Sequence, residues 1–333
     1  MLKISIAICT YNGETYLQEQ LNSYAAQTRL PDEVVVCDDC SSDKTVKIIR
    51  DFAERAPFPV RLYANETNLR STKNFEKAIS LCEGDIIFLS DQDDVWHKDK
   101  LEKFTAAFET DEQVGLVFCD GELVDEKLIS LNISAWQAIR FDKKRQNSVK
   151  NGDGLAVILD NNVVTGCMMA FRAKYKDLLL PIPNDIQGVI HDHWIALLMF
   201  TVVKVNFIPE RLVKYRQHSG QQLGLSITAE APVGLREKIA TRHDFQVQQF
   251  RLEDLKKRLS DRITAQAENY QGNKKDLLND LNERIRHVQA RTKITKSRKL
   301  GVVLIIKELF TLRYHRYSNG WRSAVKDLLL YSK

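Results

Sequence analysis

Long hydrophobic runs are absent from this sequence. The longest uncharged apolar run near the C-terminus covers residues 300–306, whereas a membrane-spanning helix needs about 20 apolar residues. Residues 1–6 show no charged segment, apolar core and cleavage site of the secretory type. We therefore expect a protein that stays in the cytosol.

Glycine and proline are also scarce. The 14 Gly and 7 Pro among 333 residues exclude a collagen-like or low-complexity chain. Cys37 and Cys40 form a C-x-x-C pair, but neither a second ligand pair for zinc nor a thioredoxin-like helix start accompanies them. The six cysteines therefore favour buried cytosolic thiols over a redox or zinc site.

Charge is divided unevenly along the chain. Residues 224–333 hold 23 Lys and Arg against 12 Asp and Glu, whereas residues 1–223 hold 26 against 32. Together with the length, this asymmetry predicts two domains, 1–223 and 224–333. The basic region suits an anionic membrane surface, a dimer contact or a solvated helical face. We expect no nucleic-acid partner, because no basic motif is interleaved with aromatic residues.

Strand-like and helical patterns alternate through the first 120 residues. The expected strands are residues 4–9, 33–37, 60–64, 85–89 and 115–119, and the expected helices are residues 16–26, 45–53, 72–81 and 98–108. This alternation predicts an α/β fold with a mostly parallel sheet flanked by helices. Residues 121–160 show no regular pattern.

Further strands are expected at residues 163–171 and 202–207, with a helix at residues 191–200 between them. Three-to-four spacing of apolar residues predicts an α-helical C-terminal extension over residues 233–290, 299–312 and 321–331.

Acidic residues follow the predicted strands, where open α/β sheets bind their ligands. Asp91, Asp93 and Asp94 come directly after the strand at residues 85–89. Three packed carboxylates raise one another's pKa unless a cation is close. Mg²⁺ and Mn²⁺ prefer oxygen ligands shared with substrate phosphates. The cluster therefore favours a divalent metal site over a solvated acidic turn.

Three motifs in order carry a resemblance to a known family. They are Cys9-Thr10-Tyr11-Asn12-Gly13, Cys37-Asp38-Asp39-Cys40-Ser41-Ser42-Asp43 and Leu89-Ser90-Asp91-Gln92-Asp93-Asp94. Over roughly residues 1–222, the chain resembles the inverting family 2 glycosyltransferases of the GT-A fold. The stretch from Ser90 to Trp96, with Lys100 after it, is similar to bacterial polysaccharide rhamnosyltransferases.

This resemblance implies a nucleotide-sugar site and a metal site. Thr10, Tyr11 and Asp38 would hold the base and ribose, with Asp39 in support. The donor site would also include Asn12, Arg70, Asn74, Asp91, Gln92 and Arg216, whose guanidinium would offset diphosphate charge. Asp93 and His218, with Asp91, would bind Mn²⁺ or Mg²⁺. Cys40 and Arg70 depart from the family pattern, which usually has glycine at both places.

The same resemblance assigns the acceptor side. Asp192 matches the catalytic base, which takes the proton from the attacking hydroxyl; helix capping is the alternative. Gly166, Cys167, His191 and Trp194 would lie beside the acceptor.

The expected activity is metal-dependent transfer of a sugar to a hydroxyl of a growing, lipid-linked surface polysaccharide or O-antigen. The expected donor is dTDP-β-L-rhamnose, with a UDP-hexose as the alternative, and the expected location is the inner face of the cell membrane. Two other classes of protein fit the sequence less well. A nucleotidyltransferase would need a glycine-rich loop that residues 10–14 lack, and a non-catalytic adaptor would not need the acidic motifs.

Overall fold

The computed structural model describes residues 1–221, 245–265, 274–295 and 298–331. It divides the chain into two compact units, Met1–Ile227 and Thr228–Lys333. The predicted boundary at residues 223 and 224 lies outside the described residues. Over the described residues, no helix combines the length and the apolar character needed to cross a bilayer.

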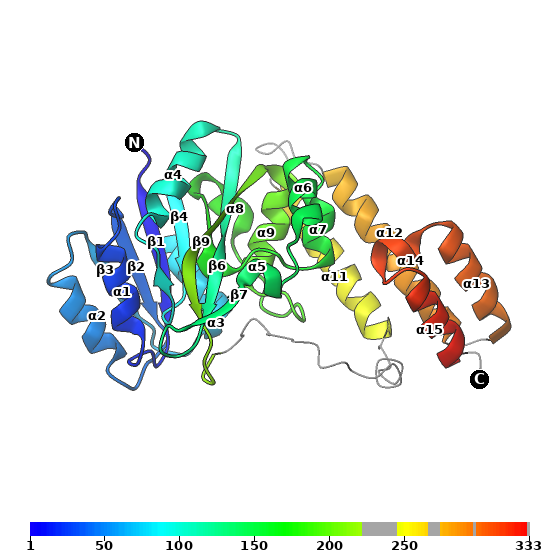
Figure 1. The fold of residues 1–333 in the computed structure, drawn as a ribbon, viewed down its shortest axis with the longest axis horizontal. Coiled ribbons are helices and arrows are strands. Elements are labelled where there is room, and N and C mark those ends of the chain that lie inside the picture. The colour runs from blue at the N-terminus through cyan, green and yellow to red at the C-terminus, as the bar shows by residue number, and fades with distance from the viewer. Residues whose placement is uncertain (222–244, 266–273, 296–297, 332–333) are drawn as a thin grey trace. The chain divides into compact units, whose positions relative to one another are not determined.

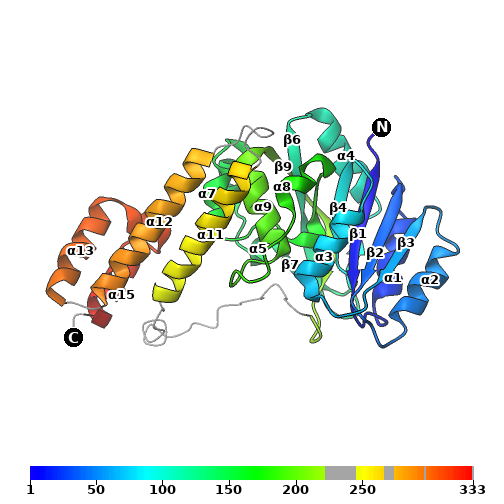
Figure 2. The same ribbon diagram turned by 180° about the vertical axis from the view of Figure 1, so that it is seen from behind.

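The first unit begins with the predicted alternation of strands and helices (Figures 1 and 2). Its elements are β1 (Ile4–Thr10), α1 (Leu17–Ala25), β2 (Glu33–Asp38), α2 (Thr45–Ala53), β3 (Val60–Ala64), α3 (Arg70–Leu81) and β4 (Ile86–Ser90). Strands β1, β2 and β4 are buried on both faces, which explains their nearly continuous apolar runs. Strands β1 to β4 pair in parallel, in the order β3-β2-β1-β4.

Later elements extend this sheet to nine strands, in the order β3-β2-β1-β4-β8-β6-β9-β5, with β7 beside β6. They are β5 (Val95–Trp96), α4 (Lys100–Thr110), β6 (Val114–Val124), β7 (Ser130–Ser134), β8 (Met169–Arg172), α9 (His191–Val202) and β9 (Lys204–Arg216). Strand β8 is antiparallel to both of its neighbours, and β6 pairs in parallel with β9. The α/β prediction is confirmed, with antiparallel pairs added in the second half.

Three sequence predictions in this half need correction. Residues 121–160 are regular and include β7, α5 (Ala135–Ala138), α6 (Lys143–Lys150) and α7 (Gly154–Asp160). Of the strand expected at 163–171, residues 163–165 are irregular, residues 166–168 form the 3-10 turn η1 (Gly166–Met168), and only the last three belong to the short β8. Strand β9 continues well beyond residue 207. A second 3-10 turn, η2 (Ala173–Tyr175), leads into α8 (Lys176–Leu179).

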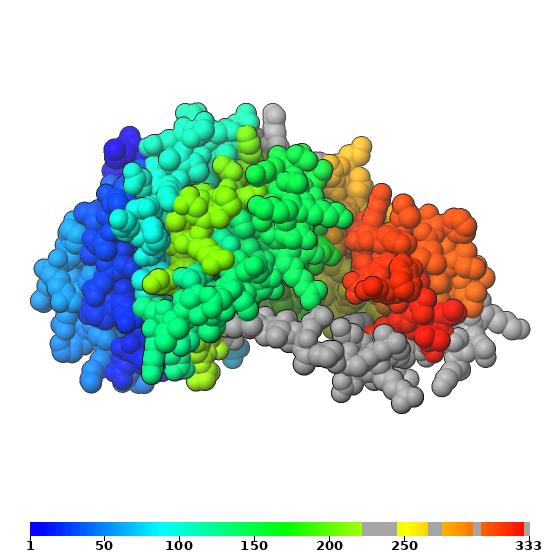
Figure 3. All heavy atoms as spheres, in the orientation of Figure 1, coloured from blue at the N-terminus to red at the C-terminus, as the bar shows by residue number. Residues whose placement is uncertain are grey.

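One core cluster lies on one face of the sheet. Alternate side chains of β1, such as Ile4, Ile6 and Ile8, pack there with Leu21 of α1 and Phe104 of α4. Helix α3 packs on β1 and β2 and lies nearest the viewer in Figure 2. In the space-filling view of Figure 3, the green atoms of α5 to α7 adjoin the yellow-green atoms of β9.

The second unit is helical in its described residues. It contains α11 (Phe245–Ala265), α12 (Lys274–Ile294), α13 (Arg298–Phe310), α14 (Arg313–Tyr317) and α15 (Trp321–Tyr331). A small apolar core joins Ile294, Ile305, Tyr314 and Ala324 from α12 to α15. The helical C-terminal extension is therefore confirmed for these residues.

Candidate active site

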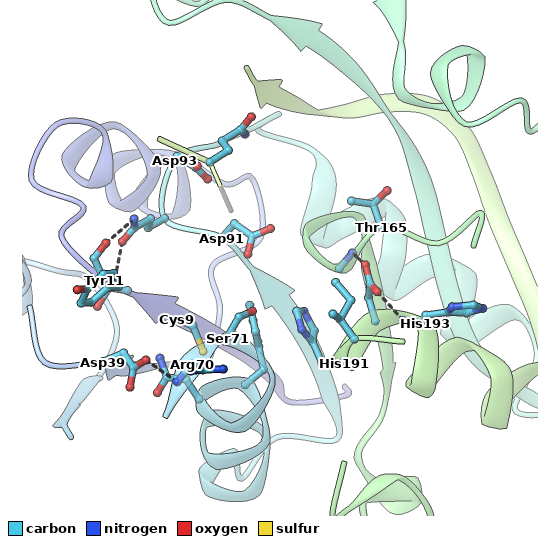
Figure 4. A pocket seen from close by; sticks show the side chains of 18 of the residues that line it. Cys9, Tyr11, Asp39, Arg70, Ser71, Asp91, Asp93, Thr165, His191 and His193 are labelled. Atoms are coloured by element: carbon cyan, nitrogen blue, oxygen red, sulfur yellow. Dashed lines mark hydrogen bonds between the residues drawn. The ribbon is translucent and has the colours of Figure 1, made fainter. Parts of the chain in front are cut away.

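A cleft of about 840 Å³ opens at the carboxyl ends of β1, β2 and β4. The first turns of α3 and α9 and the residues after β9 complete its wall. Figure 4 shows Asp39 and Arg70 toward one end, Asp91 in the middle and His191 toward the other end. The predicted site residues that line it are Thr10, Tyr11, Asp39, Arg70, Asn74, Asp91, Gln92, Asp93, Gly166, His191, Asp192 and His218.

Two adjacent carboxylates after β2 have different surroundings. Asp38 is buried, and its oxygens accept from the Thr10 hydroxyl at 2.8 Å and from the Ser41 backbone N–H at 2.9 Å. Asp39 lines the cleft and accepts from the backbone N–H groups of Leu69 and Arg70 at 2.7 and 2.9 Å. Of the two carboxylates predicted for the nucleotide site, the structure thus places Asp39 in the cleft wall and Asp38 behind it.

The loops after β1 and β4 are joined by one side chain. The Gln92 amide accepts from the Tyr11 N–H at 2.8 Å and donates to the Tyr11 carbonyl at 3.0 Å. A side chain that satisfies both the backbone N–H and the backbone carbonyl of one residue fixes the spacing of two loops. Tyr11 itself stays half exposed at the cleft.

Asp93 and His218 are far apart in sequence and adjacent in space. The Asp93 Oδ2 and His218 Nε2 atoms are 2.8 Å apart, and both residues line the cleft with Asp91. Burial raises the pKa of Asp91 to about 7, with further contributions from the charges of Asp93 and Asp192. A divalent cation would relieve this repulsion, and carboxylate and imidazole ligands suit Mn²⁺ or Mg²⁺. The residues present therefore fit the expected metal.

Asp94, Cys167 and Lys100 form a buried layer next to Asp91. One ligand atom each from Asp91, Asp94 and Cys167 lies within 4.8 Å of the others. Burial raises the pKa of Asp94 well above its usual range. The Lys100 ammonium donates to the Cys167 carbonyl at 2.7 Å and lies 3.3 Å from the centre of the Trp96 ring. Cys167 belongs to this layer and not to the cleft wall, so its predicted acceptor contact needs correction.

Asp192 lies in the first turn of α9 and lines the cleft. The helix is capped at Ile190, so Asp192 is not the capping residue. Its carboxylate accepts from Asn162 Nδ2 at 3.1 Å and from the Gly166 N–H at 3.2 Å. Burial raises its pKa to about 6, although these hydrogen bonds act in the opposite direction. A carboxylate with a raised pKa is a better proton acceptor than an ordinary one.

The neighbouring His191 is neutral. Its ring stacks on Phe75 with centroids 4.1 Å apart, and burial lowers its pKa to about 3. Asn162, which lines the cleft and holds Asp192, was missed in the sequence. Its only signal there is a polar pair, Asn161 and Asn162, before an apolar run.

Arg216 lies behind the cleft wall with its guanidinium only 1% exposed. Its Nε donates to the Asp93 carbonyl at 2.8 Å, its other nitrogens bind the Glu126 carbonyl and the Glu19 carboxylate, and it stacks on Tyr16. Each guanidinium nitrogen thus has a protein partner and Arg216 is not part of the cleft lining, so the structure does not place it at the diphosphate. Arg216 instead fixes the loop that carries Asp93.

Two other predicted residues also lie outside the cleft lining. Trp194 is buried and donates its indole N–H to the Leu179 carbonyl at 3.0 Å, so its acceptor role needs correction. Asn12 adopts a left-handed conformation, with φ of 46°, and its side chain accepts from the Ser42 N–H. In the structure it shapes the loop after β1.

Comparison with known proteins decides the family. The Glycosyl transferase family 2 model matches residues 5–175, just over half of the chain. The chain is a family 2 glycosyltransferase. An uncharacterised glycosyltransferase of Nostoc is 25% identical to it over 222 residues, which cover 65% of each chain. The dTDP-rhamnosyl transferase RfbG of Shigella flexneri is 24% identical over 236 residues, 67% of this chain and 76% of RfbG.

The fold of this glycosyltransferase matches that of a solved relative. The crystal structure of Staphylococcus aureus TarS 1-349 in complex with UDP-GlcNAc aligns with a TM-score of 0.55 and 16% identity. The alignment covers 99% of this chain and 90% of the TarS chain. This likeness and the family match confirm the GT-A fold, whereas the donor and acceptor belong to the proposal below. The chain spans about two thirds of the Nostoc protein's length.

Proposed function

We propose that this glycosyltransferase transfers a sugar, with inversion, from a nucleoside diphosphate donor to a hydroxyl of a growing, lipid-linked surface polysaccharide or O-antigen. The observation that carries the proposal is one cleft lined by Asp39, by the Asp91, Asp93 and His218 group, and by Asp192. In that order these groups suit a base, a diphosphate and an acceptor hydroxyl.

The donor end suits a uracil or thymine nucleotide. A carboxylate such as that of Asp39 accepts a hydrogen bond from the N3–H of these bases, whereas cytosine has no such donor. Tyr11 and Arg70 lie beside it in the cleft wall. When bound to Asp91, Asp93 and His218, Mn²⁺ or Mg²⁺ supplies charge stabilisation to the leaving diphosphate.

Asp192 is the proposed catalytic base. The acceptor oxygen forms a bond to the anomeric carbon while the bond from that carbon to the diphosphate breaks, and the diphosphate leaves with the bonding pair. The proton of the acceptor hydroxyl passes to Asp192. Asn162 and Gly166, which donate to this carboxylate, hold it in one orientation.

The proposed donor is dTDP-β-L-rhamnose. The similarity to RfbG, a dTDP-rhamnosyl transferase, supports it. A UDP-hexose is the second candidate, because TarS is a β-N-acetylglucosaminyltransferase solved with UDP-GlcNAc. A lipid-linked acceptor would place the enzyme in the cytoplasm, at the inner face of the cell membrane. The expected homodimer remains a prediction.

A donor panel tests this proposal. Purified protein is incubated with Mn²⁺, lipid-linked acceptor and either dTDP-β-L-rhamnose or UDP-GlcNAc, and the released nucleoside diphosphate is measured. Release of the nucleotide from the rhamnose donor alone supports the rhamnosyl proposal. Release from the UDP-sugar alone supports the UDP-hexose donor instead. Failure of both donors to bind or react would favour a non-catalytic adaptor.

A further inference from the structure

Exposed apolar side chains concentrate near the C-terminus. Of the fifteen large hydrophobic residues that are exposed in the described chain, nine lie between residues 302 and 329. They are Val302, Val303, Ile306, Phe310, Leu312, Trp321, Val325, Leu328 and Leu329. Single exposed apolar residues are ordinary, but a concentration of this kind marks an interaction surface.

These residues form a stripe on each of two helices. On α13, Val302, Val303, Ile306 and Phe310 fall within about 100° of the helical circumference, at 100° per residue. The opposite side of α13 carries Ile305 into the core of the unit.

Helix α15 also has one exposed apolar side and another side that packs into the core. Trp321, Val325, Leu328 and Leu329 share one side, while Ala324 packs into the core. The two helices pack against each other, and α14 joins the end of α13 to the start of α15. We call the two stripes, with Leu312, the α13–α15 face.

The charges around this face have one sign. Glu308 and Asp327 are the only carboxylates among residues 298–331, and both are buried. Glu308 binds His287 Nδ1 at 2.8 Å and Arg313 Nη1 at 2.9 Å. Asp327 accepts two hydrogen bonds from Arg291, each at 2.8 Å. The exposed charges of α13 to α15 therefore come from cations, among them Lys307, Arg316 and Arg322.

Within the basic region, the run of Lys and Arg at residues 284–299 is a poorer candidate for contact with lipid. Arg284 is paired with Asp280, and Arg286 with Glu283. Arg291 is buried against Asp327. Cations held by carboxylates add little attraction for an anionic surface. Lys293 is exposed, but no large apolar side chain is exposed among residues 284–295, whereas Lys307, Arg316 and Arg322 lie on the segment that carries the apolar stripes.

We propose that the α13–α15 face docks on an anionic lipid bilayer. Apolar stripes flanked by cations are the features by which a helix lies in the headgroup region without spanning the membrane. The two most exposed side chains of the α13–α15 face are Phe310 at 85% and Trp321 at 62%. Both are aromatic, and aromatic rings favour the membrane interface. This docking proposal rests on the proposed function, because docking on a membrane is useful to an enzyme whose acceptor is lipid-linked.

Vesicle flotation of the full chain tests this docking. We expect the protein to float with vesicles of phosphatidylcholine and phosphatidylglycerol, and not with phosphatidylcholine alone. Raising the salt concentration should weaken binding. The Arg316→Glu, Arg322→Glu variant should bind at least about thirtyfold more weakly, since each cation near an anionic leaflet contributes roughly fivefold.

The apolar contribution is tested by Phe310→Ser with Trp321→Ser, which should weaken binding by about tenfold or more. Phe250→Ser is the matched control, because Phe250 is 74% exposed on α11 of the same unit, and it should bind like the wild type. Circular dichroism should show unchanged helix content in all three variants, since the altered side chains are exposed.

Two results would overturn the docking proposal. One is wild-type protein that remains unbound, or binds both vesicle types equally. The other is light scattering that shows a dimer dissociated by Phe310→Ser with Trp321→Ser, which would make this face a contact between two copies. Donor binding is measured on the same preparations. If it persists while vesicle binding fails, the docking proposal falls and the proposed transferase function stands.

Discussion

Among single residues, the carboxyl group of Asp192 combines burial with three hydrogen-bond donors. Burial is the largest effect and raises its pKa to about 6, against the hydrogen bonds from His193, Gly166 and Asn162. The ionised form is the one that can accept a proton. We therefore expect the transfer rate to fall as the pH drops below about 6, measured as kcat against pH at saturating donor.

The Asp192→Asn variant tests the same residue directly. It should lower kcat by at least about a hundredfold, since a positioned general base contributes 10²–10⁴ in rate. Nucleotide binding by calorimetry should stay nearly unchanged. Asp177→Asn, at an exposed position on α8, serves as the control with normal activity. Near-normal turnover of Asp192→Asn would remove Asp192 from the mechanism.

Among the secondary-structure elements, the end of β9 supports the metal site from behind. Arg216 holds the Asp93 carbonyl, the Glu126 carbonyl and the Glu19 carboxylate together. A lysine ammonium cannot bind these three separate partners as the planar guanidinium does. Arg216→Lys should weaken Mn²⁺ binding by about tenfold or more, as loss of outer partners of a metal site does.

Mn²⁺ titration calorimetry measures this change. Arg211→Lys, at an exposed position on the same strand, should bind Mn²⁺ like the wild type. An unchanged Mn²⁺ affinity in Arg216→Lys would show that the Asp93 loop does not depend on this arginine.

The helices of the second unit depend on buried charge. Burial alone would raise the pKa of Glu308, but hydrogen bonds from His287 and Arg313 outweigh it and lower the pKa below its ordinary value of 4.5. Such a group stabilises the folded unit above pH 4.5, and this contribution is lost as the pH falls. The hydrogen-exchange protection factors of α12 to α15, which are corrected for the intrinsic pH dependence of exchange, should therefore fall on acidification below that pH.

Replacing this carboxylate checks its contribution. Glu308→Gln should lower the free energy of unfolding of the second unit by about 2 kcal/mol at neutral pH, because hydrogen bonds to a charged group are lost. It should also reduce the pH dependence. Glu253→Gln, at an exposed position on α11, should change neither. An acid sensitivity that persists undiminished in Glu308→Gln would assign it to another group.

For the whole molecule, the sequence predicts more of the architecture than of the site's details. Strands with continuous apolar runs, such as Ile4–Thr10 and Ile86–Ser90, are predicted to within a residue or two, because burial on both faces requires such runs. The 3-10 turn at Gly166–Met168 is not, since a short buried apolar segment has the same composition whether it is a strand or a turn.

The site residues are likewise predicted from the sequence only in part. The motifs place Asp93 and His218 on one site, and the structure brings them to 2.8 Å. Asp38 and Asp39 each accept three hydrogen bonds from the protein, and they differ in that Asp39 alone lines the cleft. Which of two neighbouring identical residues lines a cleft depends on tertiary contacts that the sequence does not reveal. The position of Arg216 behind the cleft wall depends on tertiary contacts in the same way.

Calorimetric titration of UDP and dTDP, with Mn²⁺ and then with a chelator, tests the central claim most directly. We expect Mn²⁺-dependent binding of both nucleotides, or a preference for dTDP, and a loss of that binding in Asp93→Asn but not in Asp177→Asn. Absence of binding to the wild type, or equal affinity in Mn²⁺ and in chelator, would contradict the proposed donor site.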